Sequence, residues 1–496
     1  MSRLSSLIQL IDSLSKAEKK KISTVIFPYD NDSDYSALYK LISSNQNMNT
    51  QKVKSEFQKI RPKAAFNTSV NYLFDTLLTI LNQLRINQDS YYTLFNMLMN
   101  AKLLYEKSIY NECFQLLTKI QTDALYYENY SILFIAQKME LDYLLSLNFP
   151  DITEKELLNK QFKVNDTIKK IRKLNEHASL YELLKYRILH KGPVRSQTQK
   201  QDLNDLVVSE MSIVSSSGFE NFDIQKNHKL FQSNYLVHVG DYKSALNSYY
   251  ELNNVFEQNM HLLSNPPMYY LDTIEGVLKT LRSIRNYDEM TYFIDKLNDL
   301  ESSSVSFKLQ IDSVVFLYKL LPFIDRWDFK GAQAIISSNR ESIIDKINFL
   351  NPDKQIQIQL YISITHFGLK EYSKARKITT QIMQSERQIF QLAAYRTIRL
   401  IHLMILHEQK EFDYIEFEIR SIKRGIKNND KTFKLEQLVL SIISKTPDEL
   451  NKAQRLHLWN KTEPKLHEIR NDKFEMQLIN VFDFTKWIEM KLTSKS

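Results

Sequence analysis

Glycine and proline are scarce in this sequence of 496 residues, which contains only 7 Gly and 10 Pro. The turns of β-sandwiches and of βαβ enzymes use both residue types, so the scarcity argues against these folds. The sequence also has no phosphate-binding loop of the GxGxxG or GxxxxGK[ST] kind and no HExxH zinc motif. The composition favours an all-α protein, because 27 Phe and 27 Tyr supply ample large side chains for a continuous helical core.

Cysteine and long apolar runs are also nearly absent. The single cysteine, Cys113, excludes an intramolecular disulfide and a cysteine-rich metal site. No apolar run approaches the ~18 residues of a membrane span, and the first residues show no signal-peptide pattern. We therefore expect a soluble, cytoplasmic protein without a membrane span.

The excess of positive charge is small. Lys and Arg number 66 and Asp and Glu 58, which leaves a net charge of +8. A solvated lysine-rich surface explains this balance, and a functional basic face is the alternative.

The stretch 353–385 predicts two helices joined by a tight turn. Apolar residues recur at spacings of four, four and three on the first helix, at Ile356, Leu360, Ile364 and Phe367. We expect Gly368 to close this helix in the left-handed conformation. The second helix starts near Glu371, and its Ala375 is small enough for a close helix crossing.

The same pattern repeats along the chain, with an aromatic residue where each second helix is expected to start. These markers are Tyr110, Tyr242, Tyr287, Phe329, Tyr372 and Phe412. From Tyr242 onward they are 45, 42, 43 and 40 residues apart, and two further, poorly defined units are expected near 144–160 and 181–206. The period exceeds the ~34 residues of a tetratricopeptide repeat (TPR). We predict a right-handed α-solenoid of TPR-like helical hairpins with lengthened, ~40-residue repeats; a coincidental all-helical fold is the alternative.

Three regions are expected. Residues 1–86 form an N-terminal helical region, in which a capping box at Ser15–Glu18 starts one helix and further helices cover 35–42, 50–60 and 66–84. Residues 87–445 form the solenoid. Residues 446–496 form capping helices, with Pro447 at a first helical position and an apolar segment at 474–492 that covers the open edge. Val25 and Ile60 are expected to face the N-terminal core.

Both ends resemble a known family. The stretches LSKAEKK at 14–20 and NYL at 71–73, LYEK at 104–107 with Tyr110, and FDFTKWIE at 482–489 are similar to a bacterial family of TPR-like helical-repeat proteins. The resemblance implies the repeat fold and a cytoplasmic bacterial setting, and it implies no activity.

The candidate catalytic groups favour structural roles. His402 and His407 are five residues apart on one helix and point about 140° apart, so they do not readily share a metal ion. Cys113 occupies the small packing position of its repeat, where we expect a buried thiol. We predict no enzyme, no metal, no cofactor and no small-molecule substrate; a hydrolase or nuclease site assembled from distant repeats is a weaker hypothesis.

The leading functional hypothesis is a scaffold that binds a peptide or a partner helix on the concave solenoid face. Candidate groove residues, taken as non-core positions of the first helices, are Asn234, His238, Gln359, Ser363, His366 and Arg399. The alternative is a nucleic-acid-associated regulator that contacts phosphates with the N-terminal helices or with a basic stripe formed by Arg420, Lys423, Arg424 and Lys427.

Overall fold

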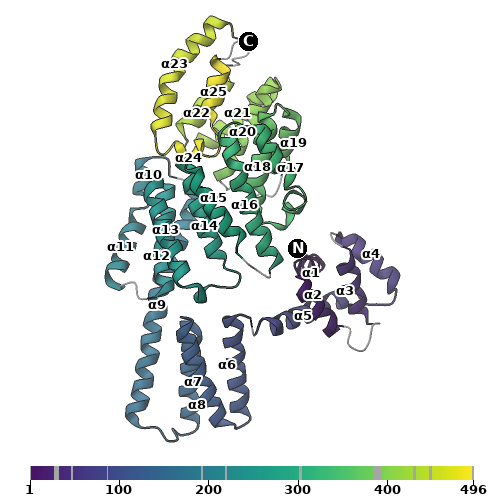
Figure 1. Cartoon of the computed structure of the whole chain (residues 1–496), viewed down its shortest axis with the longest axis vertical. Coiled ribbons are helices and arrows are strands. Elements are labelled where there is room, and N and C mark those ends of the chain that lie inside the picture. Colours follow the sequence, from purple (N-terminus) through teal and green to yellow (C-terminus); the bar gives the residue numbers. More distant parts are fainter. Residues whose placement is uncertain are drawn as a thin grey trace. The chain divides into compact units, whose positions relative to one another are not determined.

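The chain folds entirely into helices in the part that the structure, a computed structural model, describes (Figure 1). Within that part, twenty-five α-helices and two short 3-10 helices follow one another, without a strand. The prediction of an all-α fold is confirmed. The described residues are 2–26, 33–45, 48–86, 88–191, 194–217, 221–300, 304–384, 393–427, 432–445 and 450–493.

The helices belong to two compact units. Unit 1 comprises Met1–Arg172 with the short segments His261–Met268 and Glu301–Lys308. Unit 2 comprises Lys173–Met260, Tyr269–Leu300 and Leu309–Ser496. The 38-residue helix α9 contributes its first part to unit 1 and its last part to unit 2.

The first five helices of unit 1 share one apolar core. They are α1 (Arg3–Asp12), α2 (Lys16–Ile26), α3 (Asp34–Ser44), α4 (Thr50–Ile60) and α5 (Phe66–Arg85). The predicted capping box is confirmed, because the backbone N–H of Glu18 donates to Ser15 Oγ at 3.2 Å and that of Ser15 donates to Glu18 at 2.8 Å. The expected inward positions of Val25 and Ile60 are wrong, because both side chains are exposed. Ile22 and Phe57 occupy the core-facing positions of these two helices instead.

The other helices of unit 1 form consecutive hairpins. They are α6 (Ser90–Glu106), α7 (Tyr110–Tyr126), α8 (Tyr130–Ser146) and α9 (Glu154–Lys191). The buried carboxylate of Glu140 on α8 accepts hydrogen bonds from Gln121 of α7 at 2.9 Å and Lys160 of α9 at 2.6 Å. The units expected near 144–160 and 181–206 are not separate hairpins: the first spans the turn from α8 into α9, and the second begins inside α9. This helix runs on because 154–191 contains neither Gly nor Pro.

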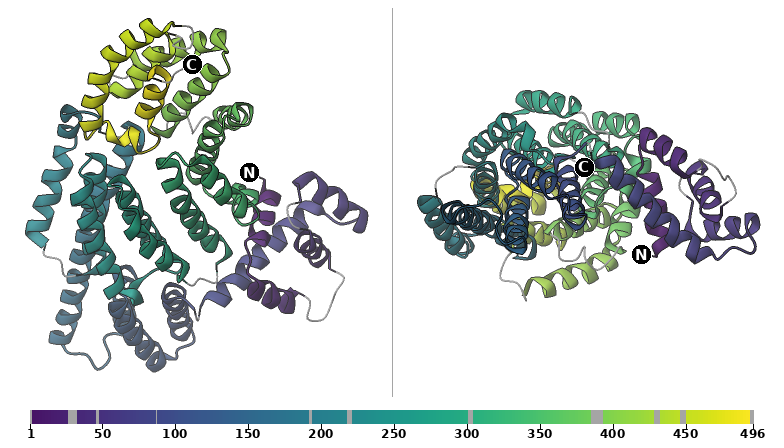
Figure 2. Two further views of the ribbon diagram at one scale, coloured as in Figure 1. Left: turned by 45° about the horizontal axis from the view of Figure 1, so that its top comes forward. Right: turned by 90° about the horizontal axis from the view of Figure 1, so that it is seen from below.

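Unit 2 continues the succession of hairpins. Figure 2 shows its teal and green helices closely spaced, one hairpin after another. The elements after α9 are α10 (Gln197–Gln201), α11 (Asn204–Ser217), α12 (Phe222–His238), α13 (Tyr242–Gln258), η1 (Met260–Leu262, in the sequence between α13 and α14), α14 (Met268–Ser283), α15 (Tyr287–Asn298), α16 (Val305–Asp325), α17 (Phe329–Ser338), η2 (Ile344–Phe349), α18 (Pro352–Gly368), α19 (Tyr372–Gln384), α20 (Ala393–Glu408), α21 (Phe412–Lys427), α22 (Lys434–Ile443), α23 (Lys452–Asn471), α24 (Met476–Ile479) and α25 (Phe484–Thr493).

The six aromatic markers each occupy the first residue of a helix, as the spacing predicts. The residue two positions before each marker has a positive φ: these residues are Ser108, Gly240, Arg285, Trp327, Lys370 and Lys410. In the turn after α18, the N–H of Lys370 donates to Phe367 O at 3.0 Å and that of Glu371 to His366 O at 2.9 Å. This pair of bonds closes a helix through one left-handed residue and satisfies its last carbonyls. Five of the six left-handed positions are not glycine, so glycine scarcity does not prevent the turns.

Gly368 has a different role from the predicted one. It is the last residue of α18, and the left-handed residue of the turn is Lys370. A Cβ atom at Gly368 would lie 2.2 Å from the ring of Phe329. The glycine therefore lets the first aromatic of α17 pack directly on the backbone of α18.

The C-terminal segment of unit 2 folds back over the turns of several hairpins. Gln477 donates to the carbonyl of His238 at 3.3 Å, next to the α12–α13 turn. The ring of Phe482 lies 5.5 Å from the ring of Trp327, in the turn between α16 and α17. It lies 6.3 Å from the ring of Phe367, near the end of α18. The segment covers the turn side of these hairpins rather than the open edge of the last hairpin alone. The predicted helix start at Pro447 lies outside the described residues.

Candidate functional site

A row of four charged residues follows one side of α14. Asp272, Glu275, Lys279 and Arg282 are spaced by three, four and three residues, so they share a helix face. Most of the other residues of the helix are buried, and a Cβ atom at Gly276 would lie 2.3 Å from the ring of Tyr249 on α13. Gly276 lies about 80° around the helix axis from the middle of the charged row, so α13 packs beside this row and not on the face opposite to it.

The charged row reaches α18, a helix from two hairpins further along the chain. Lys354 of α18 forms an ion pair with Glu275, and Arg282 Nη1 donates to the hydroxyl of Tyr361 at 3.1 Å. These side-chain contacts join α14 directly to α18.

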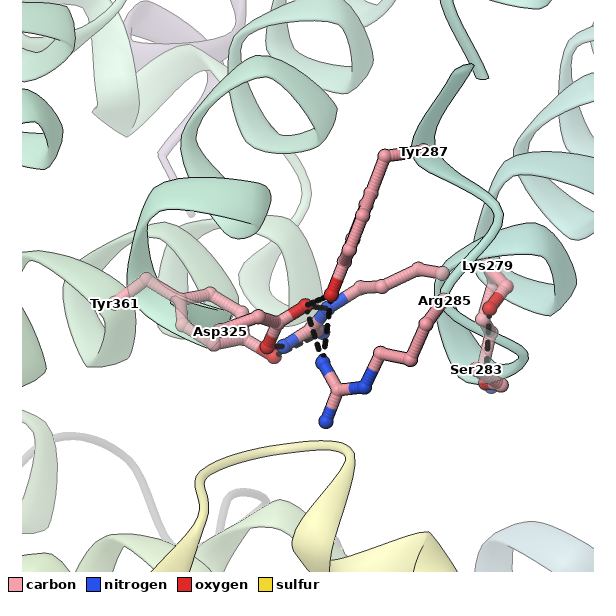
Figure 3. A network of polar contacts seen from close by, with 7 residues as sticks. Lys279, Ser283, Arg285, Tyr287, Asp325 and Tyr361 are labelled. Carbon is pink, nitrogen blue, oxygen red and sulfur yellow. Dashed lines mark hydrogen bonds and ion pairs between the residues drawn. The ribbon is translucent and has the colours of Figure 1, made fainter. Parts of the chain in front are cut away.

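A buried carboxylate holds one end of this surface together (Figure 3). Asp325, at the end of α16, accepts two hydrogen bonds from Arg282, at 2.8 and 2.9 Å. It also pairs with Arg285 at 2.8 Å and accepts a hydrogen bond from the hydroxyl of the marker Tyr287 at 3.0 Å. Residues of α14, the following turn, α15 and α16 thus meet at one side chain.

The charge states in this network support one another. Burial alone would raise the pKa of Asp325, but Arg282 and Arg285 hold it below its ordinary value. Burial disfavours the charged form of Arg282, but Tyr361 and Asp325 outweigh burial and raise its pKa. Both residues are therefore ionised at neutral pH, and the pair is a fixed structural link.

Two members of the α14 row stay in contact with solvent although protein surrounds them. Asp272 and Lys279 are exposed. Burial is nevertheless the largest cause of the raised pKa of Asp272 and of the lowered pKa of Lys279. The two observations agree because water touches both side chains while neighbouring protein replaces much of their hydration. In the described part of the chain, neither has a hydrogen-bond or ion-pair partner for its charged group.

Residues of α9 and α12 complete this surface. Lys185 of α9 lies near Asp272 and Glu275, which partly offset the lowering of its pKa by burial. Its Nζ atom is 5.5 Å from the ring centre of Tyr181, one turn earlier on α9. His238, at the end of α12, has its pKa held well below the ordinary value by burial and then by Lys279 and Lys185. We call Tyr181, Lys185, His238, Asp272, Glu275, Lys279, Arg282, Lys354 and Tyr361 the inner polar surface.

Only His238 among the six predicted groove residues belongs to the inner polar surface. The expectation that Asn234 and Ser363 lie outside the core is wrong, because both are buried. Asn234 donates to Leu230 O of its own helix at 2.9 Å, and Ser363 Oγ donates to Ala375 O at 3.1 Å. Short polar side chains are accommodated inside the hairpins because nearby carbonyls accept their hydrogen bonds.

The other three predicted groove residues are half-buried. His366 pairs with Glu371 at 2.6 Å, and Arg399 with Glu418 at 2.6 Å. Both therefore already have partners within the chain. Gln359 lies on α18 and is half-buried.

The predicted basic stripe lies on α21. Arg420, Lys423 and Arg424 are exposed there. Arg420 also forms an exposed ion pair with Glu416 at 2.7 Å. Lys427 ends the helix, and its side chain lies outside the described residues.

The predicted structural roles of the candidate catalytic groups are supported. Cys113 is buried, and its Sγ donates to Ala101 O at 3.2 Å. His402 is buried with its Nδ1 2.8 Å from the hydroxyl of Thr379, and His407 is also buried. Within the described ranges, no three His, Cys, Asp or Glu residues are placed to hold a metal ion.

The inner polar surface was missed at the sequence level, although one signal was present. The stretch 271–282, LDTIEGVLKTLR, carries charges at 3-4-3 spacing inside an otherwise apolar helix. Such a row on an inner helix indicates a surface that is not filled by core packing. The contributions of α9 and α18 had no comparable signal.

The described part of the chain is all-helical, its helices pack consecutively, and α14 carries a row of charged residues that reaches α18. No protein-family model, curated protein or solved structure matches the chain. No helix in the described part is both long enough and apolar enough to cross a membrane.

Proposed function

We propose that the protein is a non-enzymatic interaction scaffold of the cytoplasm, a right-handed α-solenoid of TPR-like hairpins that binds a peptide or a partner helix on its concave face. The observation that carries the proposal is the direct contact of α14 with α18, through Lys354 and Glu275 and through Arg282 and Tyr361. In a curved stack of hairpins, the inner helices form a surface that can surround an extended ligand.

The chemistry of the inner polar surface supports binding rather than core packing. Asp272 and Lys279 remain exposed, and neither charge is paired in the described part of the chain. Unpaired polar groups on a preformed concave surface provide specificity for a ligand, because the ligand supplies their missing partners.

Photo-cross-linking from two matched positions tests this proposal. A photoreactive benzoylphenylalanine replaces Tyr181 on the inner polar surface or Tyr414 on α21, which is 60% exposed. In a lysate of the source cells, we expect position 181 to form defined adducts with a peptide or protein, resistant to nuclease, and position 414 not to form them. Adducts at 414 alone, or none at 181, would contradict the proposal.

A second candidate function is nucleic-acid binding through α21. Arg420, Lys423 and Arg424 are exposed, and the same helix exposes the aromatic rings of Tyr414 and Phe417. Cations near exposed aromatic rings suit the phosphates and bases of a single strand.

The dependence of nucleic-acid affinity on salt concentration tests this second function. On duplex DNA, the affinity should fall with a log–log slope of about −0.9 per neutralised phosphate, and Lys423→Glu should make the slope shallower. Absence of any binding to duplex or single-stranded probes at low salt would eliminate this function.

A further inference from the structure

We propose that one face of α6 is the contact surface for a second copy of this chain, in an antiparallel pair of α6 helices. The face carries five large side chains that are 37–58% exposed, which we call the α6 outer stripe: Tyr91, Tyr92, Phe95, Met99 and Leu103. The stripe belongs to unit 1, so the proposal is independent of the ligand proposed for the inner polar surface, whose residues belong to unit 2.

Helix α6 has two apolar faces, and one of them packs on α7. Leu94, Leu98 and Ala101 are buried, and Ala101 O accepts a hydrogen bond from Cys113 Sγ of α7 at 3.2 Å. The outer stripe is centred about 120° further around the helix axis. A helix that is apolar all round is normally covered all round. The second face therefore calls for a partner beyond the described part of the chain.

The outer stripe lies in a stretch without charge. From Ser90 to Ala101, about three turns, α6 contains no charged residue, and its two charged residues are Lys102 and Glu106. The solvated face of a helix normally carries charged residues, whereas the central part of a protein interface is depleted of them. The second face of α6 thus has the composition of an interface.

The order of residues in the stripe fits a two-fold symmetric pair. Four of its members are spaced by four residues, which makes them one ridge of the kind that packs most often between helices: Tyr91, Phe95, Met99 and Leu103. The ring centres of Tyr91 and Phe95 lie 4.7 Å apart, so the first half of the ridge is an aromatic pair. In an antiparallel pair with its axis between Phe95 and Met99, the aromatic half of each copy meets the Met99 and Leu103 half of the other. Methionine sulfur makes favourable contacts with aromatic rings.

The charges near the end of α6 favour the antiparallel over the parallel arrangement. A parallel copy would place Lys102 against Lys102 and Glu106 against Glu106. The antiparallel copy places Lys102 opposite the ring of Tyr92, where a cation is favourable. It also brings Glu106, the last residue of its helix, toward the first turn of the other α6, where the helix dipole favours a negative charge.

The apolar area is sufficient for a stable pair. From their exposed fractions, the five side chains present about 450 Å² per copy, since a large aromatic side chain buries ~150–250 Å² in all. Homodimer interfaces are about 65% apolar, so two stripes with their polar rims bury about 1,400 Å² in total, within the ~1,200–2,000 Å² of stable interfaces. Interfaces of this size have dissociation constants in the micromolar range or below.

Sedimentation velocity of the full-length protein measures the association. We expect wild-type protein to be a dimer at tens of micromolar and to dissociate on dilution. Met99→Glu places a charge beside the two-fold axis in both copies and should weaken association about 100-fold or more. Leu145→Glu on α8, at a side chain that is 61% exposed, is the matched control and should associate as the wild type does.

A complementary pair of variants separates the contact from damage to the fold. Phe95→Lys alone and Met99→Glu alone should each be monomeric, because like charges meet near the axis. An equimolar mixture should form a heterodimer, since the antiparallel arrangement sets the new cation of one copy against the new anion of the other. Misfolding cannot produce this outcome, and a mixture that stays monomeric contradicts the arrangement.

Cysteine cross-linking tests the antiparallel register. Tyr91→Cys and Leu103→Cys proteins, mixed and oxidised, should give a disulfide-linked heterodimer because the two positions oppose each other. Tyr91→Cys alone should not link to itself, since its two copies are about 18 Å apart along the helices. The native Cys113 is buried and serves as an unreactive background. Linkage of Tyr91→Cys to itself, rather than to Leu103→Cys, overturns the antiparallel pair.

Two further outcomes overturn the proposal. One is wild-type protein that remains monomeric at tens of micromolar, and the other is a dimer that Met99→Glu leaves intact, because it then forms through another face. A lipid surface is the alternative occupant of an apolar stripe. Phosphatidylcholine vesicles that bind monomeric wild-type protein and not Met99→Glu would assign the stripe to lipid instead of a second copy. Peptide binding by the inner polar surface is tested separately and stands or fails without the dimer.

Discussion

The indole Nε1 of Trp487 donates a hydrogen bond to Glu408, 3.1 Å away. Glu408 ends α20, and Trp487 lies on α25, 79 residues later. Lys491, also on α25, donates to the same carboxylate at 2.8 Å. The C-terminal helix is thus fixed to the end of an inner helix of unit 2 by polar bonds as well as by apolar packing.

Removing the Trp487 side chain should destabilise unit 2. Trp487 is 3% exposed, so Trp487→Ala leaves a large cavity and deprives Glu408 of a donor. We expect the free energy of unfolding to fall by about 3–5 kcal/mol. Met490→Ala on the same helix, at a side chain that is 48% exposed, is the control and should change it by at most about 0.5 kcal/mol. Urea unfolding followed by circular dichroism measures both, and equal losses would refute the capping role.

Neutralising Asp325 should be more costly than neutralising a surface acid. Asp325→Asn leaves the nearly buried Arg282 without its counter-ion, and losing one partner of a buried pair costs about 3–5 kcal/mol. Asp75→Asn is the control, because Asp75 pairs with Arg3 in solvent and such pairs contribute at most about 1 kcal/mol.

The same network predicts an acid transition. The pKa of Asp325 is lower in the folded than in the unfolded state, so its contribution to stability is present above the unfolded pKa of about 3.9 and is lost as pH falls through the folded pKa. Unfolding of wild-type protein between pH 5 and pH 2 should therefore show a steeper loss than unfolding of Asp325→Asn. Parallel pH profiles would contradict this.

His402 should make stability depend on pH in a higher range. Burial lowers the pKa of His402 to about 4, against 6.5 in a model peptide. Because the unfolded state binds the proton more tightly, stability is complete above pH 6.5 and falls between pH 6.5 and 4, by about 3 kcal/mol at most. His402→Asn, which keeps an acceptor for Thr379, should lack this part of the pH dependence in thermal unfolding scans. A wild-type slope in the variant would contradict the assignment.

Substitution should destabilise the protein more at Gly368 than at Lys370. Gly368→Ala places a methyl group against the ring of Phe329 and should destabilise unit 2 by about 1–3 kcal/mol. Lys370→Gly removes a side chain from a left-handed residue with φ 63° and should leave stability within about 1 kcal/mol of wild type. A larger loss in Lys370→Gly than in Gly368→Ala would reverse the assigned roles.

Cys113 should react slowly with thiol reagents in the folded protein. Its side chain is buried, and burial raises the pKa of the thiol, so little thiolate is available for attack. Labelling with Ellman's reagent should be complete in urea and much slower without it. Rapid labelling of the folded protein would contradict this and would show that the α6–α7 hairpin opens readily.

The local structure of this protein is determined largely by short-range pattern in its sequence. The capping box at Ser15 starts α2, and the six aromatic markers start their helices, because helix periodicity and caps act over three or four residues. Gly368 shows the limit of such rules. Its sequence position suits a helix end, but the ring of Phe329, from another helix, decides why glycine is present.

Only the tertiary structure decided which polar residues share a surface. Lys354 and Glu275 are separated by 79 residues, and their contact depends on how tightly successive hairpins curve. Curvature is the sum of many small packing angles between helices, and no local pattern encodes it. Ser363 was expected to face a ligand and instead donates to Ala375 O, whereas Lys279 on α14 is exposed. Periodicity identifies the two faces of a helix, but the packing of its neighbours determines which face remains available.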